Sequence, residues 1–262
     1  MSEWAASRDA RRRHGFLAGV SFLTRVPVGV QIGERDVAAS VAWFPVVGSL
    51  IGLAGGAVYV GASELWPPLI SALLAIGAAV AITGALHEDG LGDTADAFGA
   101  SSTGRDPQPV LKDPRMGVFG VVALVGASAI RVAGVAALTP RVGLLALVAA
   151  HALARGVSAV VVVTAPSAST GLGSTYARLT PRWRGWAAAV VGAVIATGCL
   201  GPVGLIAVAV AGLAALLLVR WATRALAGVG GDVLGAIEQV GEVVTLLVAV
   251  AAFSRGLTGP LA

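Results

Sequence analysis

Charged and aromatic side chains are scarce in this 262-residue sequence. Charged residues make up 12% and aromatic residues 5%, and the charged share is about half of that in an ordinary soluble domain. Apolar residues make up 56% and the mean hydropathy is +0.86, which excludes a disordered chain. The only cysteine, Cys199, lies in an apolar run, so a disulfide-stabilised fold is excluded as well. The composition predicts an integral membrane protein.

Basic residues exceed acidic residues only slightly. The chain has 18 Lys and Arg against 14 Asp and Glu, which gives a net charge of +4, and its isoelectric point is about 10.2. The basic residues do not gather into a stripe, and all of them except Lys112 are arginine. We therefore expect no nucleic-acid partner.

Long apolar runs predict an all-α fold, a polytopic helical bundle in the membrane that forms a single domain over 1–262. A spanning helix needs roughly 20 mostly apolar residues. Runs of this kind occupy 37–62, 69–87, 117–139, 142–164, 185–221 and 233–253. The run 185–221 is too long for one span, and Gly201 and Pro202 in its middle predict a turn that divides it. The sequence therefore predicts about seven transmembrane helices.

The segment 1–36 differs from the rest of the chain. Four arginines and His14 precede a short apolar piece from Phe16 to Leu23, which Arg25 and Pro27 interrupt. A secretory signal peptide begins in this way, but no small-residue cleavage site follows closely. We favour an amphipathic segment that lies at the membrane interface or re-enters the membrane.

The loops between the spans predict the orientation. If the N-terminus is cytoplasmic, the cytoplasmic loops are 88–116, 165–184 and 222–232. That side then holds 14 of the Lys and Arg residues, counting the arginine at the edge of the sixth span, and the outer side holds Arg141 and Arg255. Six of the 14 acidic residues also lie in 88–116. We therefore expect an active site that faces the cytoplasm.

The acidic segment 87–99, HEDGLGDTADAFG, is the main candidate site. If it continues the second span as a helix, Asp89, Asp93 and Asp96 lie at positions i, i+4 and i+7 and share one face. Three neighbouring carboxylates repel one another, which predicts a compensating cation. Hard oxygen ligands without cysteine favour Mg²⁺ or Mn²⁺, and a substrate phosphate would complete the coordination. Gly90 and Gly92 are expected to let that phosphate approach the backbone. A solvated helix end is the alternative.

A second charged cluster, Lys112-Asp113-Pro114-Arg115, precedes the third span. Pro114 predicts a rigid, non-helical segment at Asp113. Lys112 and Arg115 are suited to phosphate oxygens, and Asp113 is suited either to a metal ion or to orienting Arg115. Anchoring of the chain at the membrane surface is the alternative.

Several ionisable residues fall inside the predicted spans, where they are expected to face the bundle interior and to find partners. They are Arg131, His151, Arg155, Glu238 and Glu242. Asp232 begins the last span, at the place where an N-cap residue belongs.

Ordered sequence blocks cover most of the chain. They are FLTRVPV at 22–28, WFPVVG at 43–48, LHEDGLGDTAD at 86–96, KDPRMGVFG at 112–120 and GDVLGA at 231–236. With these blocks the sequence resembles the cobalamin synthase family of membrane enzymes, also called adenosylcobinamide-GDP ribazoletransferases. The resemblance implies Mg²⁺-dependent transfer of the adenosylcobinamide phosphate group from adenosylcobinamide-GDP to α-ribazole or its 5′-phosphate, with release of GMP. It also implies a location in the bacterial cytoplasmic membrane, with membrane lipid around the spans, and leaves open whether the chain forms a homo-oligomer.

The resemblance also implies roles for individual residues. The implied metal ligands are Asp89, Asp93, Asp96, Asp113 and Asp232. The implied catalytic residues are Asp89, Asp93, Asp96 and His87, with His87 or a spare carboxylate accepting the hydroxyl proton. The implied substrate contacts are Lys112, Arg115, Arg25, Arg155 and Glu242.

Some positions depart from the family pattern, and two other functions stay open. Glu88 stands where an apolar residue is usual, Pro114 where serine is common, and Ser169 where arginine is usual. A CDP-alcohol phosphotransferase also aligns membrane aspartates, but its motif has Ala-Arg where this chain has Asp93-Thr94. An ion-coupled transporter predicts acidic residues near the bilayer midplane, whereas most acids here lie at one membrane face.

Overall fold

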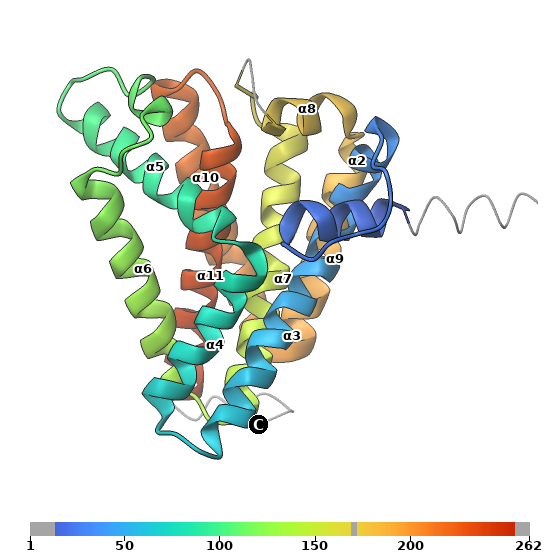
Figure 1. The fold of residues 1–262 in the computed structure, drawn as a ribbon, viewed down its shortest axis with the longest axis vertical. Coiled ribbons are helices and arrows are strands. Elements are labelled where there is room, and N and C mark those ends of the chain that lie inside the picture. Colours follow the sequence, from blue (N-terminus) through green and yellow to red (C-terminus); the bar gives the residue numbers. More distant parts are fainter. Residues whose placement is uncertain (1–13, 169–171, 255–262) are drawn as a thin grey trace, which may run out of the picture.

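The computed structural model describes residues 14–168 and 172–254, which form a bundle of long helices (Figure 1). The helices, in chain order, are His14–Leu23, α2 (Glu34–Ser40), the 3₁₀ helix η1 (Val41–Trp43), α3 (Phe44–Ser63), α4 (Pro68–Thr83), α5 (Leu86–Ser102), the 3₁₀ helix η2 (Val110–Lys112), α6 (Val118–Ala136), α7 (Pro140–Thr164), α8 (Leu172–Leu179), α9 (Arg182–Leu200), α10 (Val203–Ala225) and α11 (Gly231–Phe253). The predicted all-α fold is confirmed.

The helices agree in number with the predicted spans. Within the described residues, six helical stretches are long and apolar enough to cross a membrane: Glu34–Ser63, α6, α7, α9, α10 and α11. The shorter helices α4 and α5 pass the same test only together. The prediction of about seven spans therefore corresponds to six uninterrupted spans and one broken pair. The predicted turn in 185–221 is also present, because α9 ends at Leu200 and α10 begins at Val203.

A sharp bend separates α4 from α5. The two helices meet at 91°, and Gly84 and Ala85 between them both have left-handed backbone, with φ of +64° and +59°. A Cβ atom at position 84 would collide with the side chain of Arg25, whose backbone N–H donates to the Ile82 carbonyl at 2.7 Å. The acidic segment is helical as expected. However, it does not continue the second span, because the chain turns at Gly84.

Helix α7 forms the centre of the bundle. Of its most apolar 18-residue window, 83% is buried, and it packs against α3, α9 and α11. Small residues let these helices approach closely, since a Cβ at Gly192 would lie 2.9 Å from the Ala152 carbonyl oxygen of α7. In the peripheral helices α6, α9 and α10, only 28% of the most apolar 18-residue stretch is buried. Their outer faces carry exposed Val and Leu side chains, such as Val122 and Leu205, as expected for contact with lipid.

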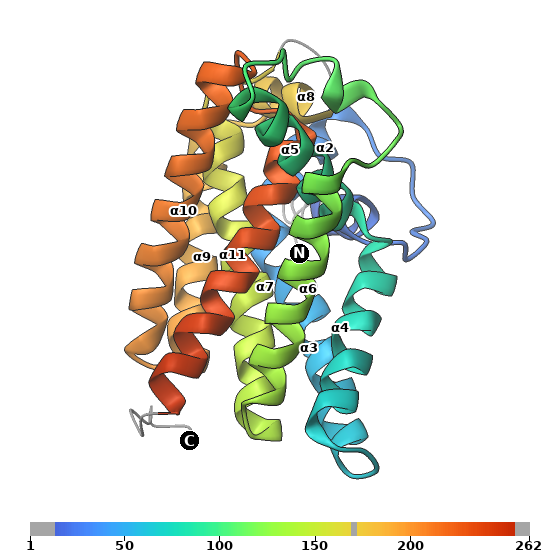
Figure 2. The same cartoon turned by 90° about the vertical axis from the view of Figure 1, so that its left-hand side faces the viewer.

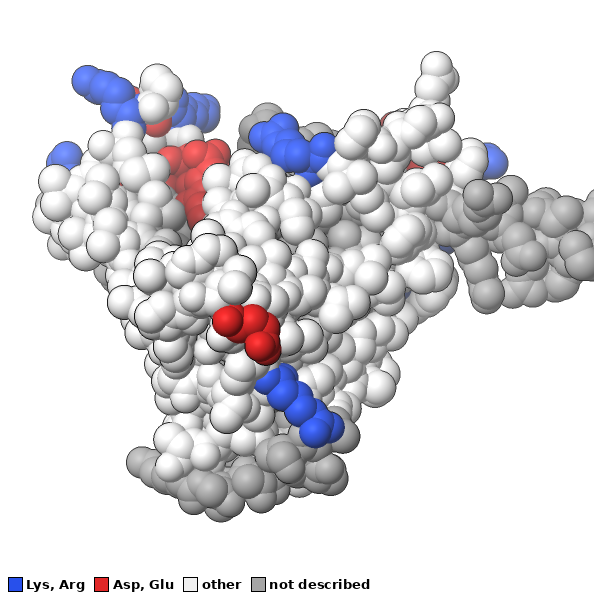
Figure 3. Space-filling model, turned by 60° about the horizontal axis from the view of Figure 1, so that its bottom comes forward, with Lys and Arg blue, Asp and Glu red and all other residues white. Residues whose placement is uncertain are grey.

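The connecting segments gather at two ends of the bundle (Figures 1 and 2). Segments 103–117, 165–168, 180–181 and 226–230 lie at the end that also holds α2 and α8, which we call the loop-rich end. The short connections 64–67, 137–139 and 201–202 lie at the opposite end. Charged side chains in Figure 3 are concentrated toward the loop-rich end, where acidic residues line a hollow, and most of the visible flank is uncharged. This grouping of loops matches the predicted one.

The helix His14–Leu23 runs across the bundle, at a steep angle to the long helices (Figure 1). The Phe16 ring packs edge to face on Trp43 at a centroid distance of 5.6 Å, and a Cβ at Gly15 would touch Ala39. The arrangement fits the predicted interfacial segment. Residues 1–13, which carry four of the arginines, lie outside the described residues.

Candidate active site

A cavity of about 370 Å³ lies at the loop-rich end. Its lining comes from elements far apart in the chain, namely His14–Leu23, α3, α5, η2, α7, α8, α11 and the segments 103–109, 165–168 and 226–230. The polar lining residues are His87, Asp89, Gln108, Lys112, Ser158, Asp232 and Glu238, and the aromatic ones are Phe22, Phe44 and Tyr176. Four predicted site residues, His87, Asp89, Lys112 and Asp232, therefore share one cavity.

A close crossing of α5 and α11 brings Asp89 and Asp232 together. A Cβ at Gly90 would lie 2.7 Å from the Asp232 carbonyl oxygen and 3.2 Å from the Gly235 Cα, so the two backbones are in direct contact. Only glycine allows this approach. The expectation that Gly90 admits a phosphate is therefore wrong, because the backbone of α11 already occupies that space.

Gly92 also has a packing role. A Cβ at this position would lie 3.0 Å from the Met116 Cε and 3.4 Å from a methyl group of Leu124. The residue lets α5 pack closely on the start of α6. The predicted approach of a phosphate at Gly92 is wrong for the same steric reason.

Carboxylates are concentrated around Asp93 on α5, a helix outside the six uninterrupted spans. Burial of Asp93, together with the nearby charges of Asp89, Asp232 and Asp96, raises the pKa of the Asp93 carboxyl to about 6. Within the described residues, no three His, Cys, Asp or Glu side chains are close enough to hold a metal ion by themselves. The predicted five-carboxylate metal cluster is therefore not assembled, although Asp89, Asp93 and Asp232 are within electrostatic range of one another.

Asp96 binds the N-terminus of α6. Its two carboxylate oxygens accept hydrogen bonds from the backbone N–H groups of Gly117 at 2.6 Å and Gly120 at 2.9 Å. A negative charge at this place also interacts favourably with the helix dipole. The structure thus directs Asp96 toward α6 and away from the predicted metal cluster.

Asp113 orients Arg115, which is one of its two predicted roles. The Arg115 guanidinium donates to both carboxylate oxygens, at 2.9 and 2.8 Å, and its backbone N–H adds a third bond at 3.0 Å. These bonds hold the pKa of Asp113 down to about 2. Neither residue lines the cavity, and the Arg115 side chain is 87% exposed. The predicted metal role of Asp113 has no geometric support.

His87 uses both ring nitrogens in the structure. Its Nε2 lies 2.7 Å from Glu238 Oε2, and its Nδ1 lies 3.2 Å from Arg155 Nη2. A guanidinium can only donate, so Nδ1 accepts and the ring proton sits on Nε2, facing Glu238. To accept a proton from a substrate, His87 would have to break one of these contacts.

Arg155 and Glu242 lie deeper, in a network of buried charges. The Arg155 guanidinium donates to Glu242, and Glu242 also lies 2.7 Å from His151 Nδ1 and 2.8 Å from Arg131 Nη2. Both Arg155 and Glu242 are 1% exposed and neither lines the cavity. The prediction that Arg155 and Glu242 contact the substrate is therefore wrong. The two side chains are each other's partners, as expected for charges inside a bundle.

The same network explains the unusual Glu88. Its Oε1 accepts hydrogen bonds from Arg131 Nη1 and from Gln239 Nε2, both at 3.0 Å, and Arg131 donates in turn to Gln239 Oε1 at 2.8 Å. The Glu88 carboxylate, which departs from the pattern that the resemblance implies, is thus matched by a buried guanidinium on α6.

Sequence reasoning missed several cavity residues. Gln108 donates to the Leu226 carbonyl at 2.8 Å and so ties the loop before η2 to the α10–α11 connection. Phe22 and Phe44 lie within two of the ordered sequence blocks, at 22–28 and 43–48, which was a usable signal, whereas nothing in the sequence marked Tyr176. Arg25, a predicted substrate contact, packs at the α4–α5 bend and is absent from the cavity lining. Ser169 lies outside the described residues.

The 165–168 segment is held to the α10–α11 connection by a parallel bridge between Ser167 and Val229. The Ala168 N–H donates to the Val229 carbonyl at 3.0 Å, and the Val229 N–H donates to the Pro166 carbonyl at 2.8 Å. These bonds fix Ala168 and Gly230 at the rim of the cavity, where both are lining residues.

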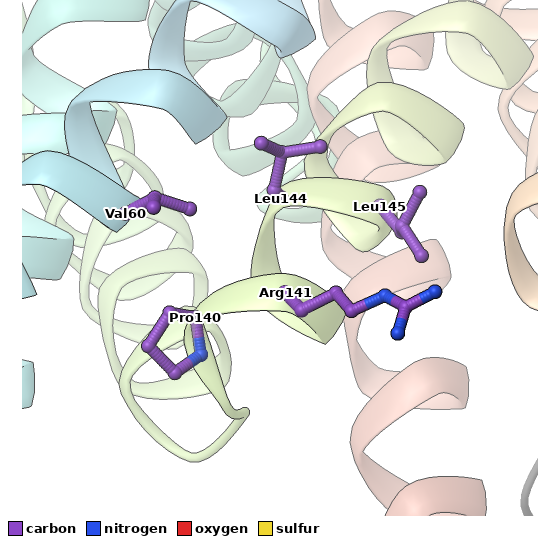
Figure 4. Close-up of a pocket in the computed structure, with 5 residues that line it drawn as sticks. All are labelled: Val60, Pro140, Arg141, Leu144 and Leu145. Atoms are coloured by element: carbon purple, nitrogen blue, oxygen red, sulfur yellow. The ribbon is translucent and has the colours of Figure 1, made fainter. Parts of the chain in front are cut away.

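A second, more open pocket lies at the opposite end, between α3 and α7 (Figure 4). It is lined by Val60, Pro140, Leu144 and Leu145, with Arg141 as its charged residue. Since it has no carboxylate and no convergent polar groups, it lacks the features of a catalytic site.

Comparison with known proteins identifies the family. A family profile described as cobalamin-5-phosphate synthase matches residues 15–250. The chain belongs to this family. The matched range of the cobalamin-5-phosphate synthase family includes every residue that lines the cavity.

Relatives named adenosylcobinamide-GDP ribazoletransferase match nearly the whole chain. The relative from Bradyrhizobium diazoefficiens is 44% identical over 90% of this chain and 92% of its own length. Those from Ralstonia nicotianae and Azorhizobium caulinodans are 34% and 36% identical, over 94% and 88% of this chain and 98% and 92% of their own lengths. No solved structure matches the chain. The chain is an enzyme of cobalamin synthesis, and neither the CDP-alcohol phosphotransferase nor the transporter is favoured.

Proposed function

We propose that the chain transfers the adenosylcobinamide phosphate group from adenosylcobinamide-GDP to α-ribazole or α-ribazole 5′-phosphate and releases GMP. The observation that carries the proposal is the cavity at the loop-rich end, which joins two carboxylates, Asp89 and Asp232, with the amine of Lys112. The relatives that match this chain over most of its length are named for the same reaction.

The reaction replaces the phosphoanhydride bond of the donor with a new phosphate ester bond. A ribose hydroxyl oxygen of the acceptor attacks the phosphorus that carries adenosylcobinamide, and a new P–O bond forms. The bond from this phosphorus to the bridging oxygen breaks, and GMP leaves with that oxygen. The hydroxyl proton passes to a base. Such transfers depend mainly on positioning and on neutralising phosphate charge.

Asp89, Asp93 and Asp232 are the proposed Mg²⁺ ligands. Burial, together with the charges of Asp89 and Asp232, raises the pKa of Asp93, and hard carboxylate oxygens suit this ion. Mg²⁺ is usually held by a few protein carboxylates and by substrate phosphates, so a site that is incomplete without substrate fits its chemistry. When bound, Mg²⁺ would neutralise charge on the diphosphate. Asp96 and Asp113 are already engaged elsewhere, which reduces the proposed ligands to three.

The other cavity residues position the reactants. Lys112 is an exposed cation at the end of η2, and the Gln108 bond to Leu226 holds this loop at the cavity. We assign phosphate binding to Lys112. We assign the hydroxyl proton to a cavity carboxylate, because both ring nitrogens of His87 are engaged.

We place the loop-rich end on the cytoplasmic side of the bacterial cytoplasmic membrane. Segments 103–116 and 165–168 at this end belong to the predicted cytoplasmic loops, and the predicted cytoplasmic side holds 14 of the 18 Lys and Arg residues, as the positive-inside rule requires. A single cysteine placed in segment 103–110, with Cys199 replaced by serine, tests this. Labelling by an impermeant thiol reagent from the periplasmic side of intact cells would contradict the assignment.

The activity is tested with purified protein in lipid nanodiscs, supplied with adenosylcobinamide-GDP, α-ribazole and Mg²⁺. We expect equal amounts of GMP and corrinoid product, and loss of both with a chelator. Asp89→Asn should abolish turnover while the protein stays folded. Glu64→Gln, which removes a carboxylate at the opposite end, is the matched control and should leave turnover unchanged. If folded wild-type protein releases no GMP, the proposed function is wrong.

A further inference from the structure

Part of the cavity has no role in the phosphate chemistry. Phe22, Phe44 and Tyr176 line it together, and we call these three side chains the aromatic wall. They come from the helix His14–Leu23, from α3 and from α8, so three separate elements converge to form the wall.

The aromatic wall is a single compact cluster. The Phe22 and Phe44 rings are stacked at 5.7 Å with 13° between their planes, and the Tyr176 ring lies 4.7 Å from Phe22 and 5.9 Å from Phe44. Phe44 and Tyr176 are 2% and 6% exposed, whereas Phe22 is half-buried. The three rings pack on one another and present apolar surface to the cavity that they line.

We propose that the aromatic wall binds the base of the acceptor nucleoside, the apolar heteroaromatic ring of α-ribazole. This inference rests on the proposed function. Flat bases stack on aromatic side chains. A nucleoside suits a cavity of about 370 Å³, whereas the corrin ring of the other substrate is too large to be enclosed there.

The neighbours of the wall favour this base over guanine, the other base in the reaction. Val162 and Leu234 also line the cavity, and both pack in the same apolar cluster as the three rings. Guanine carries donors and acceptors along its edge, and these would lose hydrogen bonds to water without replacement against such side chains. A benzimidazole presents an apolar benzene edge that suits them.

This placement also orients the acceptor for the reaction. Asp89 and Asp232 line the same cavity as the aromatic wall. A nucleoside whose base stacks on the wall therefore has its ribose near these carboxylates, where the attacking hydroxyl is needed. The wall is thus a specificity and positioning element for the acceptor substrate.

The test compares two Phe→Leu variants. Phe22→Leu removes a half-buried ring of the wall, and Phe98→Leu is the matched control. Phe98 is 52% exposed, packs on Trp221 at 5.5 Å and lies outside the cavity. Each variant is assayed for GMP release with α-ribazole and adenosylcobinamide-GDP varied in turn. Binding of α-ribazole alone to the protein in nanodiscs is measured by calorimetry.

We expect Phe22→Leu to raise the KM and the Kd for α-ribazole about tenfold, in the range that loss of one stacked ring produces. The KM for adenosylcobinamide-GDP and the kcat at saturating α-ribazole should stay within about twofold. Phe22→Tyr, which keeps a ring, should restore most of the affinity, and Phe98→Leu should behave as wild type. If Phe22→Leu fails to fold, Phe22→Met and Phe22→Tyr give the same comparison.

Two outcomes would overturn the inference. In the first, Phe22→Leu raises the KM for adenosylcobinamide-GDP and weakens inhibition by GMP, with α-ribazole unaffected, which would assign the wall to guanine. In the second, Phe22→Leu changes the KM for neither substrate, although the wild type is active. Failure of the proposed function itself is distinguishable, because the wild type would then release no GMP at all.

Discussion

Replacing Asp96 separates two roles that the sequence alone does not distinguish, a metal ligand and a helix cap. In the structure one carboxylate oxygen of Asp96 accepts a hydrogen bond from the backbone N–H of Gly117, and the other accepts one from the backbone N–H of Gly120. We expect Asp96→Ala to destabilise the protein, because these two donors lose a charged acceptor at the start of α6.

The size of the effect follows from the two hydrogen bonds. A hydrogen bond to a charged group contributes roughly 1.5 to 3 kcal/mol. We take the lower value for each because Asp96 is only half-buried, which gives a loss of about 3 kcal/mol for Asp96→Ala. Asp96→Asn keeps one acceptor oxygen but turns an amide N–H₂ toward the other donor, so at least one bond is lost. We expect it to lie between the wild type and Asp96→Ala in stability.

The assay combines unfolding with metal titration. Thermal unfolding in detergent should rank the proteins as wild type, Asp96→Asn and Asp96→Ala, from most to least stable. The Mg²⁺ concentration that gives half-maximal GMP release should be nearly the same in Asp96→Asn and the wild type, whereas Asp93→Asn should raise it strongly. The reasoning is refuted if Asp96→Asn leaves the unfolding temperature unchanged and shifts the Mg²⁺ dependence instead.

Three further predictions concern the neighbouring residues. Because the pKa of Asp93 is raised to about 6, its carboxyl gains a proton as the pH falls through 6. The Mg²⁺ concentration for half-maximal GMP release should therefore rise by up to about tenfold per pH unit below that value. Equal Mg²⁺ concentrations at pH 5.5 and 7.5 would contradict this prediction. Glu88→Leu should lower the unfolding temperature, because it removes one of the carboxylates that compensate the buried charge of Arg131, and the protein should lose roughly 3 kcal/mol of stability. An unchanged unfolding temperature would show that Glu242 alone compensates the guanidinium. Gly90→Ala should reduce kcat at least tenfold in an inserted, folded protein, because a Cβ there would push α11 away from α5. Gly126→Ala is the control and should leave kcat unchanged, because no atom lies near the added Cβ.

The spans could be predicted from the sequence because a helix that crosses a bilayer needs a continuous run of apolar residues, and such a run is recognised without knowledge of the rest of the fold. The turn at Gly201 and Pro202 was readable for a similar reason, since both residues interrupt helices wherever they stand. The bend after α4 was not readable. Gly84 stands in an apolar run like several other glycines of this chain, and nothing in the sequence marks the left-handed backbone of Ala85.

The candidate site was predictable in composition but not in geometry. Helical spacing correctly grouped Asp89 and Asp93, yet it could not show that Asp96 meets the end of α6. Gly90 illustrates the same limit, because a glycine beside acidic residues suggests room for a ligand, while the structure fills that room with another backbone. Both outcomes depend on contacts between helices that are distant in the chain, and spacing within one segment of the sequence does not reveal such contacts.

The broken pair α4 and α5 has a consequence for the parity of the bundle. If the pair counts as one crossing beside the six uninterrupted spans, the number of crossings is odd. The beginning of α2 and the end of α11 then lie on opposite sides of the membrane, and Figures 1 and 2 show α2 at the loop-rich end and the last turns of α11 at the opposite end. A protease site added after α11 would therefore be cut from the side opposite to the cavity. In reconstituted vesicles, such a site would report what fraction of the molecules presents its cavity to added substrates.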